Sequence, residues 1–377
     1  MLLAVSLSMM PATLGAGPAG AARTLAAPHT TRPHTVPATS MGPSTPGAQL
    51  WVARYSGPGT RFDGANALGV SPDGSIVFVT GESIGSMGYG DLDYATVAYD
   101  ASTGSQLWVK RYAGPAGSDD YAGDLGVSPD GSRVFVTGDS YGSTGYPDYA
   151  TVAYDASTGS QLWVMRYDGP GNVGDFTYDL EVSPDGSAVF VTGGSVGPSG
   201  SGGDYATVAY DASTGSQLWA KSYNGPANDS DFAIGLGVSP EGSTVFVTGN
   251  SIGSTSDYDY ATVAYNASTG SRLWAKRYNG PRDDIDDATA LGVSPDGSSV
   301  FVTGFSTGPM GDFDYATLAY DATTGSQLWV RRYNGPVHGH DWANALGVSP
   351  DGSTVFVAGS STSRKNLDYA TVAYSIT

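Results

Sequence analysis

Short apolar runs alternate with segments rich in glycine, serine and aspartate from residue 48 to the end of the chain. Residues 76–80 (Ile-Val-Phe-Val-Thr) and 93–99 (Asp-Tyr-Ala-Thr-Val-Ala-Tyr) are β-branched and aromatic, which indicates strands. The Ser-Pro-Asp-Gly segment from Ser71 and the Ala-Ser-Thr-Gly segment from Ala101 are turn signals. Some runs are apolar on both faces and none has helical periodicity, so the pattern predicts sheets covered on both sides.

The same unit recurs through the chain. Its tryptophans lie 55 to 57 residues apart, at Trp51, Trp108, Trp163, Trp219, Trp274 and Trp329. A fixed period of this size is typical of solenoids and propellers. Each full unit contains four expected strands, and small antiparallel sheets packed face to face around an axis would cover both faces. We therefore predict an all-β fold, a six-bladed β-propeller with four-stranded antiparallel blades over residues 48–377.

The two ends of the repeat region suggest how the ring closes. The region starts with a lone tryptophan strand at 50–55 and stops after the strand at 368–374, where another tryptophan strand would follow. We expect the N-terminal strand to complete the last blade and close the ring.

One motif adds a family resemblance. Ala98-Tyr-Asp100-Ala-Ser-Thr103-Gly104-Ser-Gln-Leu-Trp108 resembles the tryptophan-docking motif of quinoprotein-type propellers, and the Val-Ser-Pro-Asp-Gly turn before a Val-Phe-Val-Thr strand is similar to YVTN and WD40-like bacterial propellers. The resemblance covers residues 48–377 and implies the fold, because these motifs are the packing parts of a blade. It would imply a quinone cofactor for an enzyme, but the vicinal disulfide of quinoprotein dehydrogenases cannot form in a chain without cysteine.

Composition and the N-terminal segment indicate where the protein is located and which partners it can have. Residues 1–22 have an apolar core followed by small residues, which predicts a signal peptide, and the Pro/Thr/Ala-rich linker 23–47 is expected to be disordered. We expect a secreted, extracellular monomer without a membrane span. The formal charge of −19 argues against a nucleic-acid partner. The lack of cysteine excludes disulfides and thiolate metal sites.

Two aspartate series recur once per unit on the face that carries the variable loops. They could form a cation site, but a residue needed in every blade more often holds that blade, by accepting loop N–H bonds or pairing with arginine. Arg54, Arg111, Arg166, Arg277 and Arg332 also recur, and Ser222 breaks that series. The first series, just before the inner strand, is Asp63, Asp120, Asp175, Asp231, Asp286 and Asp341. The second series, just before a tyrosine in each unit, is Asp93, Asp148, Asp204, Asp259, Asp314 and Asp368.

A Gly-x-Ser-x-Gly pattern occurs in five units, as in residues 81–85. The pattern resembles a hydrolase nucleophile elbow, which requires a strand, a tight turn and a helix, with a histidine in reach. Here a loop and another strand follow, so we interpret the pattern as turn chemistry.

The sixth unit differs from the others and provides the candidate ligand-binding residues. These could bind a carboxylate, a phosphate or a sugar acid, with the tryptophan as a stacking surface. The two histidines could instead bind a metal, or the sector could merely neutralise the closure junction. The residues are His338, His340, Trp342, Arg364 and Lys365, with Arg61 from the neighbouring first unit.

The densest acidic segment is a weak candidate for a metal site. It contains Asp283, Asp284, Asp286 and Asp287, and oxygen-rich loops suit Ca²⁺, although such loops are mostly just solvated. No other cofactor is predicted. Apart from the sixth unit, we identify no acid/base cluster that distinguishes one unit from the rest, and we assign no catalytic residue.

These observations predict a secreted, non-catalytic propeller scaffold that binds a protein or a glycan through its variable loop face, because loops on a rigid scaffold carry function. The alternative is a propeller enzyme of the quinoprotein, lactonase or lyase kind, with its site on the loop face near the axis. Near-identical blades favour the scaffold, because a catalytic site needs residues that differ from blade to blade.

Overall fold

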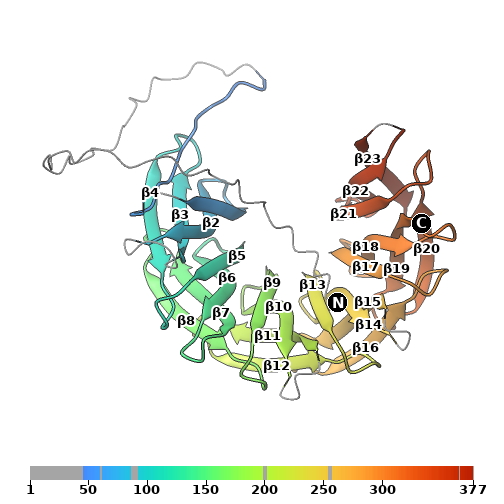
Figure 1. Cartoon of the computed structure of the whole chain (residues 1–377). Helices are drawn as coiled ribbons and strands as arrows, with labels where there is room; N and C mark the ends of the chain where they lie inside the picture. The colour runs from blue at the N-terminus through green and yellow to red at the C-terminus, as the bar shows by residue number, and fades with distance from the viewer. Residues whose placement is uncertain are drawn as a thin grey trace, which may run out of the picture. The chain divides into compact units, whose positions relative to one another are not determined.

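The computed structural model describes residues 46–59, 62–85, 92–197, 202–253, 257–364 and 366–376. The chain divides into two units, Met1–Thr45 and Pro46–Thr377, and all 23 strands lie in the second (Figure 1). The predicted signal peptide and nearly all of the predicted linker, as well as Arg61 and Lys365, fall outside the described residues. Within the described ranges, no helix has the length and hydropathy needed to cross a membrane.

The strands form six antiparallel sheets, each built from consecutive strands, which confirms the predicted six-bladed all-β propeller. Blades 1 to 3 contain β1 (Asp63–Val70), β2 (Ile76–Ile84), β3 (Leu92–Asp100), β4 (Gln106–Tyr112), β5 (Asp120–Val127), β6 (Arg133–Tyr141), β7 (Pro147–Asp155), β8 (Gln161–Tyr167), β9 (Asp175–Val182), β10 (Ala188–Val196), β11 (Gly203–Asp211) and β12 (Gln217–Tyr223). Blades 4 to 6 contain β13 (Asp231–Val238), β14 (Thr244–Ile252), β15 (Tyr258–Asn266), β16 (Arg272–Tyr278), β17 (Asp286–Val293), β18 (Ser299–Thr307), β19 (Phe313–Asp321), β20 (Gln327–Tyr333), β21 (Asp341–Val348), β22 (Thr354–Thr362) and β23 (Leu367–Ser375).

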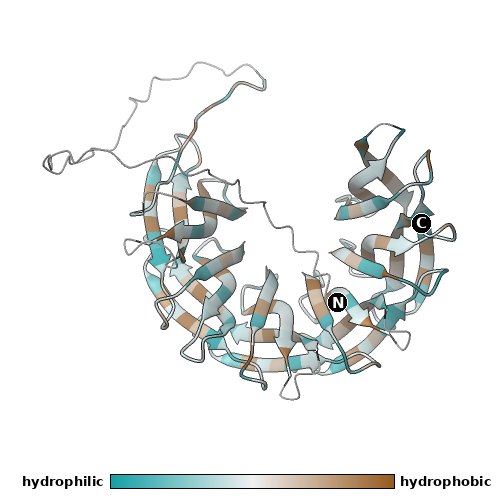
Figure 2. Cartoon of the chain, viewed as in Figure 1, coloured by the Kyte–Doolittle hydropathy of each residue, from teal (hydrophilic) through white to brown (hydrophobic). Residues whose placement is uncertain are grey.

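The core consists of the interfaces between consecutive blades. Figure 2 shows apolar positions along the strands of every sheet. One buried cluster joins Phe78 and Trp108 of blade 1 to Leu125, Val134 and Val136 of blade 2, and similar clusters join the later pairs. The second and third strands of the internal blades therefore bury both faces, as their continuous apolar runs predicted.

The repeat tryptophans from Trp51 to Trp274 each dock onto an outer turn of the following blade. Trp108 Nε1 donates a hydrogen bond to the Ala156 carbonyl oxygen over 2.9 Å. The turn glycine beneath the ring, Gly159, has a φ of 68°, and a Cβ there would lie 2.6 Å from the indole. Glycine is thus needed both for backbone conformation and for space. The same donation joins Trp51 to Ala101, Trp163 to Ala212, Trp219 to Ala267 and Trp274 to Ala322.

A second polar contact repeats in the buried part of each interface. The hydroxyl of Tyr205 on β11 donates to the carbonyl oxygen of Ala261 on β15, over 3.0 Å. Its counterparts are Tyr94 with Ala150, Tyr149 with Ala206, Tyr260 with Ala316 and Tyr315 with Ala370.

The expected ring closure is not present in this structure. Blade 6 has three strands, and among the described residues no hydrogen-bonded pairing joins 50–55 to β23. Trp51 and Tyr55 instead form hydrogen bonds with blade 1, through Ala101 and Arg111. The segment thus makes the contacts of an outer strand toward the following blade, but not the strand pairing that closure also requires.

The inner strands of blades 6 and 1 also indicate an open ring. A Cβ on Gly292 of blade 5 would lie 2.6 Å from Leu346 of blade 6, whereas at the equivalent Gly347 nothing lies within 4 Å. Leu68 of blade 1, the counterpart of Leu346, is 63% exposed. The surfaces that closure would bring together are therefore both solvent-facing.

Two tyrosine variants distinguish this open arrangement from a closed ring. Tyr205→Phe should lower the free energy of unfolding by about 1 kcal/mol, because it removes a buried hydrogen bond between two blades. Tyr369→Phe should leave it unchanged, since Tyr369 is 98% exposed. Denaturant unfolding measures both values. A loss at Tyr369 equal to that at Tyr205 would show that the ring closes in solution.

Candidate functional site

An arginine on the outer strand binds together the loop-face end of a blade. Arg166 Nη1 donates to Ser140 Oγ over 2.5 Å and to the Tyr112 hydroxyl over 3.2 Å. Its Nη2 donates to the Ser140 carbonyl over 2.6 Å and to Asp148 over 2.7 Å. The ion pair recurs as Arg111–Asp93, Arg277–Asp259 and Arg332–Asp314. The guanidinium thus joins a neighbouring tyrosine, a strand end and a carboxylate.

These contacts change the interpretation of the Gly-x-Ser-x-Gly serines. Ser83 and Ser140 are buried near the ends of β2 and β6, and each accepts from the arginine of its own blade. The segment continues into a loop and an antiparallel strand, so it lacks the helix of a nucleophile elbow. The serines serve the arginine network rather than a turn.

The other aspartate series holds the loop before each inner strand. Asp120 Oδ2 accepts the backbone N–H of Gly114 over 2.6 Å. The same bond joins Asp63 to Gly57, Asp175 to Gly169, Asp231 to Gly225, Asp286 to Gly280 and Asp341 to Gly335. These carboxylates have a structural partner in every blade.

Blade 3 lacks the arginine that binds the loop-face end of blades 1, 2, 4 and 5. Ser222 pairs with Ala206 in the register that places Arg166 opposite Ala150, so a serine replaces the arginine. Ser195 Oγ, whose counterparts accept from arginine, is buried and makes no hydrogen bond of normal geometry. The sequence signal was visible in the break of the arginine series at Ser222, but its consequence for Ser195 required the structure.

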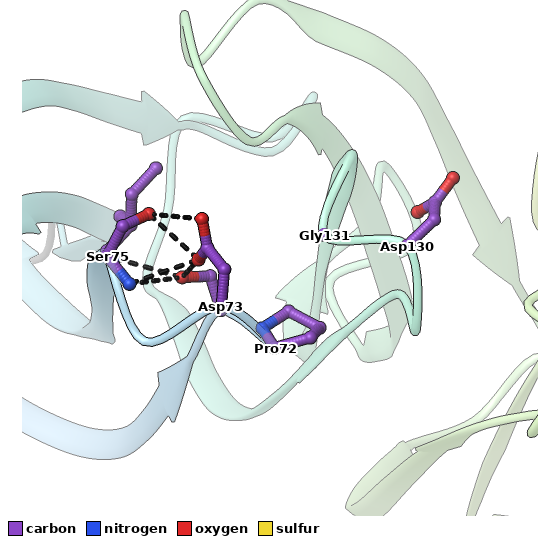
Figure 3. A pocket seen from close by; sticks show the side chains of 7 residues that line it. Pro72, Asp73, Ser75, Asp130 and Gly131 are labelled. Carbon is purple, nitrogen blue, oxygen red and sulfur yellow. Dashed lines mark hydrogen bonds between the residues drawn. The ribbon is translucent and has the colours of Figure 1, made fainter.

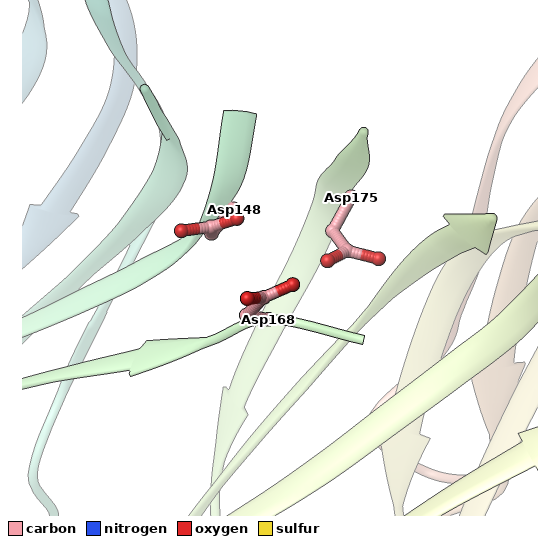
Figure 4. Close-up of side chains that lie close together, drawn as sticks. All are labelled: Asp148, Asp168 and Asp175. Atoms are coloured by element: carbon pink, nitrogen blue, oxygen red, sulfur yellow. The ribbon is translucent and has the colours of Figure 1, made fainter. Parts of the chain in front are cut away.

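Three carboxylates meet at the junction of blades 2 and 3. Figure 4 shows Asp148, Asp168 and Asp175, which each present an oxygen within 4.8 Å of the other two. Burial raises the pKa of Asp175 to about 6, and the charges of Asp148 and Asp168 raise it further, against the hydrogen bond from the Gly169 amide. Burial, with the charge of Asp231, also raises the pKa of Asp204 to about 6.

A second acidic group lies on the inner strands of the same blades. Asp124 accepts from the Leu180 amide over 3.0 Å, and Asp179 accepts from the Leu236 amide over 2.6 Å. Burial raises the pKa of both carboxyls, and the charge of Asp124 adds to the rise at Asp179. Sequence reasoning missed this asymmetric pair, although the other units have alanine or glycine at its position.

The sixth unit contributes an aromatic surface with Phe313 of blade 5. The rings of Phe313 and His340 lie 4.9 Å apart, and His340 stacks on Trp342 at 5.5 Å with 24° between planes. Phe305 extends the surface at 4.9 Å from Phe313. His340 Nδ1 accepts the Phe313 amide over 3.1 Å, so a neutral ring carries its proton on Nε2 and offers a donor. Sequence reasoning had not included the two phenylalanines.

His338 has other partners than that surface. His338 has a φ of 53°, and its Nδ1 lies 3.3 Å from Asn334 Oδ1, so the two histidines have different partners. Arg364 is exposed. Arg61 and Lys365 lie outside the described residues.

The acidic run of blade 5 is not brought to one point. Asp283 accepts from Asn279, and Asp284 accepts from the Ile285 amide. Asp286 binds Gly280 within its own blade, while Asp287 lies against Asn250 of blade 4, which lowers its pKa against a larger rise from burial. The four carboxylates predicted as a Ca²⁺ candidate therefore have separate partners.

The turn face has a small pocket of ≈ 190 Å³ between the Ser-Pro-Asp-Gly turns of blades 1 and 2 (Figure 3). One of its two carboxylates, Asp73, accepts hydrogen bonds from Ser71 Oγ over 2.6 Å and from the Ser75 amide and hydroxyl. Hydrogen bonds from Ser71 and Ser75 lower the pKa of Asp73 to about 2. The pocket's polar groups thus stabilise the turn itself.

Buried carboxyls predict a pH-dependent stability. Burial raises the pKa of Asp139 to about 7, so the folded state holds a proton that the unfolded chain releases near pH 4. Stability should therefore fall as pH rises from about 4 to about 7, by about 1–2 kcal/mol after allowance for partial exposure.

Asp139→Asn should raise the melting temperature at pH 8 and flatten its dependence between pH 5 and 8. Asparagine can still accept the Thr177 amide, as Asn250 accepts the Ala288 amide in blade 4. Thermal unfolding across this range measures the effect, and an unchanged slope in the variant would contradict it.

Comparisons with known proteins agree with the fold. A family model described as outer membrane protein assembly factor BamB matches residues 43–362. No curated protein sequence matches the chain.

Solved structures show the same architecture at low identity. Kuenenia stuttgartiensis hydrazine synthase is 16% identical, with a TM-score of 0.55 over 79% of this chain and 74% of that one. The Dos1 propeller is 16% identical, with a TM-score of 0.53 over 78% of this chain and 64% of that one. The Pseudomonas aeruginosa periplasmic gluconolactonase PpgL is 18% identical, with a TM-score of 0.51 over 87% and 88%. At these identities the likeness shows the fold alone.

Proposed function

Because the chain belongs to the BamB family of quinoprotein-type propeller repeats, we propose that it is a non-catalytic, extracytoplasmic scaffold that binds a protein or a glycan through its loop face. The family's description as an assembly factor for outer membrane proteins supports a protein partner. The apolar leader and the acidic composition fit export.

The aromatic surface around Phe313, His340 and Trp342 is the observation that supports this proposal most. Three ring systems in mutual contact form a rigid platform, with His340 exposed and Trp342 half-buried. Aromatic side chains that combine apolar area with few rotatable bonds dominate binding energies at protein interfaces and also stack on sugars. The exposed Arg364 of the same blade adds a donor for carboxylates.

The repeated carboxylates support a scaffold over an enzyme. In blades 1, 2, 4 and 5 the loop-face aspartates are engaged by an arginine or by loop amides. Asp124 and Asp179 each accept a backbone amide of the next blade, so this pair has a structural task as well. A propeller enzyme of the lactonase kind remains the alternative function.

Trp342→Ala should weaken binding to the partner at least about tenfold, because a stacking platform at an interface centre contributes about 2 kcal/mol or more. Panels of secreted proteins and of glycans, screened by surface plasmon resonance, identify the partner and measure the loss. Leu328→Ala is the matched control, since Leu328 is 53% exposed on the outer strand β20 rather than in the loop-face platform.

Loss of binding in Leu328→Ala, with none in Trp342→Ala, would move the interface to the outer strands and contradict the proposal. Hydrolysis of a sugar lactone above the buffer rate, abolished by His340→Ala in a folded protein, would replace the scaffold by the enzyme.

A further inference from the structure

The acceptors that bind an arginine in the sister blades are all present in blade 3. In blade 2 these acceptors are the Tyr112 hydroxyl, Ser140 and Asp148, as described above. The corresponding groups of blade 3 are Tyr167, Ser195 and Asp204. The side chain of Ser222 ends one atom beyond Cβ, so it cannot reach the position of the guanidinium. The oxygens remain, and the positive charge that they surround in other blades is gone.

Two of the oxygens at this place are deeply buried. Ser195 is 4% exposed and Asp175 is fully buried. Ser195 Oγ and Asp175 Oδ1 lie 2.0 and 2.6 Å from a Cβ built on Gly169. Ser195 Oγ forms no hydrogen bond of normal geometry, whereas its counterparts in the sister blades, such as Ser140, accept from an arginine.

The same glycine position shows what is missing. At Gly57 of blade 1 and Gly225 of blade 4, the third neighbour of the built Cβ is an arginine Nη1, at 3.1 and 3.2 Å. Blade 3 has Ser222 in place of that arginine. The oxygens therefore face a position that holds a cationic nitrogen in the sister blades.

A second substitution at the same junction adds a carboxylate. Asp168 stands where the other full units have Ala113, Asn224, Asn279 and Asn334. Its carboxylate meets those of Asp148 and Asp175 (Figure 4). Asp204 is the Cα partner of Ser195 in the pairing of β10 with β11, and the charges of Asp175, Asp168 and Asp204 all raise the pKa of Tyr167. The junction of blades 2 and 3 thus has four carboxylates and one guanidinium group, that of Arg166. The junction of blades 1 and 2 has three carboxylates and two guanidinium groups.

We propose that blade 3 binds a divalent cation, Ca²⁺, in the place that an arginine guanidinium takes in the sister blades. Asp168, Asp175 and Asp204 supply the carboxylates, and Ser195 and Tyr167 supply neutral oxygens. An oxygen-only set of mixed charge, drawn from two blades and without imposed octahedral geometry, suits Ca²⁺ better than Mg²⁺ or Zn²⁺. The ion replaces the arginine as the link between blades 2 and 3, and it does not depend on the partner of the loop face.

The test starts from purified full-length protein stripped with chelator. Titration with Ca²⁺ by calorimetry should show one site, and Ca²⁺ should raise the melting temperature. Sodium chloride at matched ionic strength is the control for screening of the −19 charge and should not reproduce the shift.

Three variants locate the ion. Ser222→Arg should raise the melting temperature without Ca²⁺ and abolish the response to Ca²⁺, because the guanidinium fills the site. Asp168→Asn, which restores the residue of the sister blades, should weaken Ca²⁺ binding at least about tenfold, since ligand charge sets Ca²⁺ affinity. Asp284→Asn removes a carboxylate from the acidic run of blade 5 and should leave the response unchanged.

The proposal is overturned if Ca²⁺ neither binds nor shifts the melting temperature beyond the sodium chloride control. It is equally overturned if Asp168→Asn keeps wild-type affinity, or if Asp284→Asn is the variant that loses it. Should Ser222→Arg fail to fold, the pair Asp168→Asn and Asp284→Asn still decides the question.

Discussion

The directed contact between one blade and the next is the constraint on which this fold depends. Each docking tryptophan places its indole on the following turn and donates to a backbone carbonyl there, while a buried tyrosine does the same deeper in the interface. A blade alone would expose the apolar faces of its second and third strands. The contact therefore fixes both the spacing of the tryptophans in the sequence and the glycine of the turn that receives them.

The repeat made most of the fold predictable. Strand runs such as Ile76–Ile84 are continuous and β-branched, and the turns between them carry glycine where the backbone requires a positive φ. Closure was not predictable in the same way, because residues 50–55 can dock on blade 1 through Trp51 without pairing to β23. Local pattern specifies which surfaces fit together, but not whether a contact between the two ends of the repeat forms.

The site was predictable only in part. His340 and Trp342 stood out as residues unlike their counterparts, and the structure does place them together. Phe305 and Phe313 complete the surface from another blade, and the register of β18 and β19 was needed to find them. Ser195 looked like one of five equal serines. Ser195 differs because Ser222 replaces the arginine that would bind it, and the sequence around Ser195 contains no sign of that replacement.

Docking that runs from each blade to its successor makes the protein a one-dimensional series of coupled units. The stability of such a series is close to a sum of unit terms and nearest-neighbour terms, so a unit with one neighbour is held less firmly than a unit with two. Blade 6 has a docking partner on one side only in this structure, and its outermost strand, β23, is largely exposed. Local opening should then begin at this terminal unit, with slower amide exchange in the internal blades, which have a neighbour on both sides.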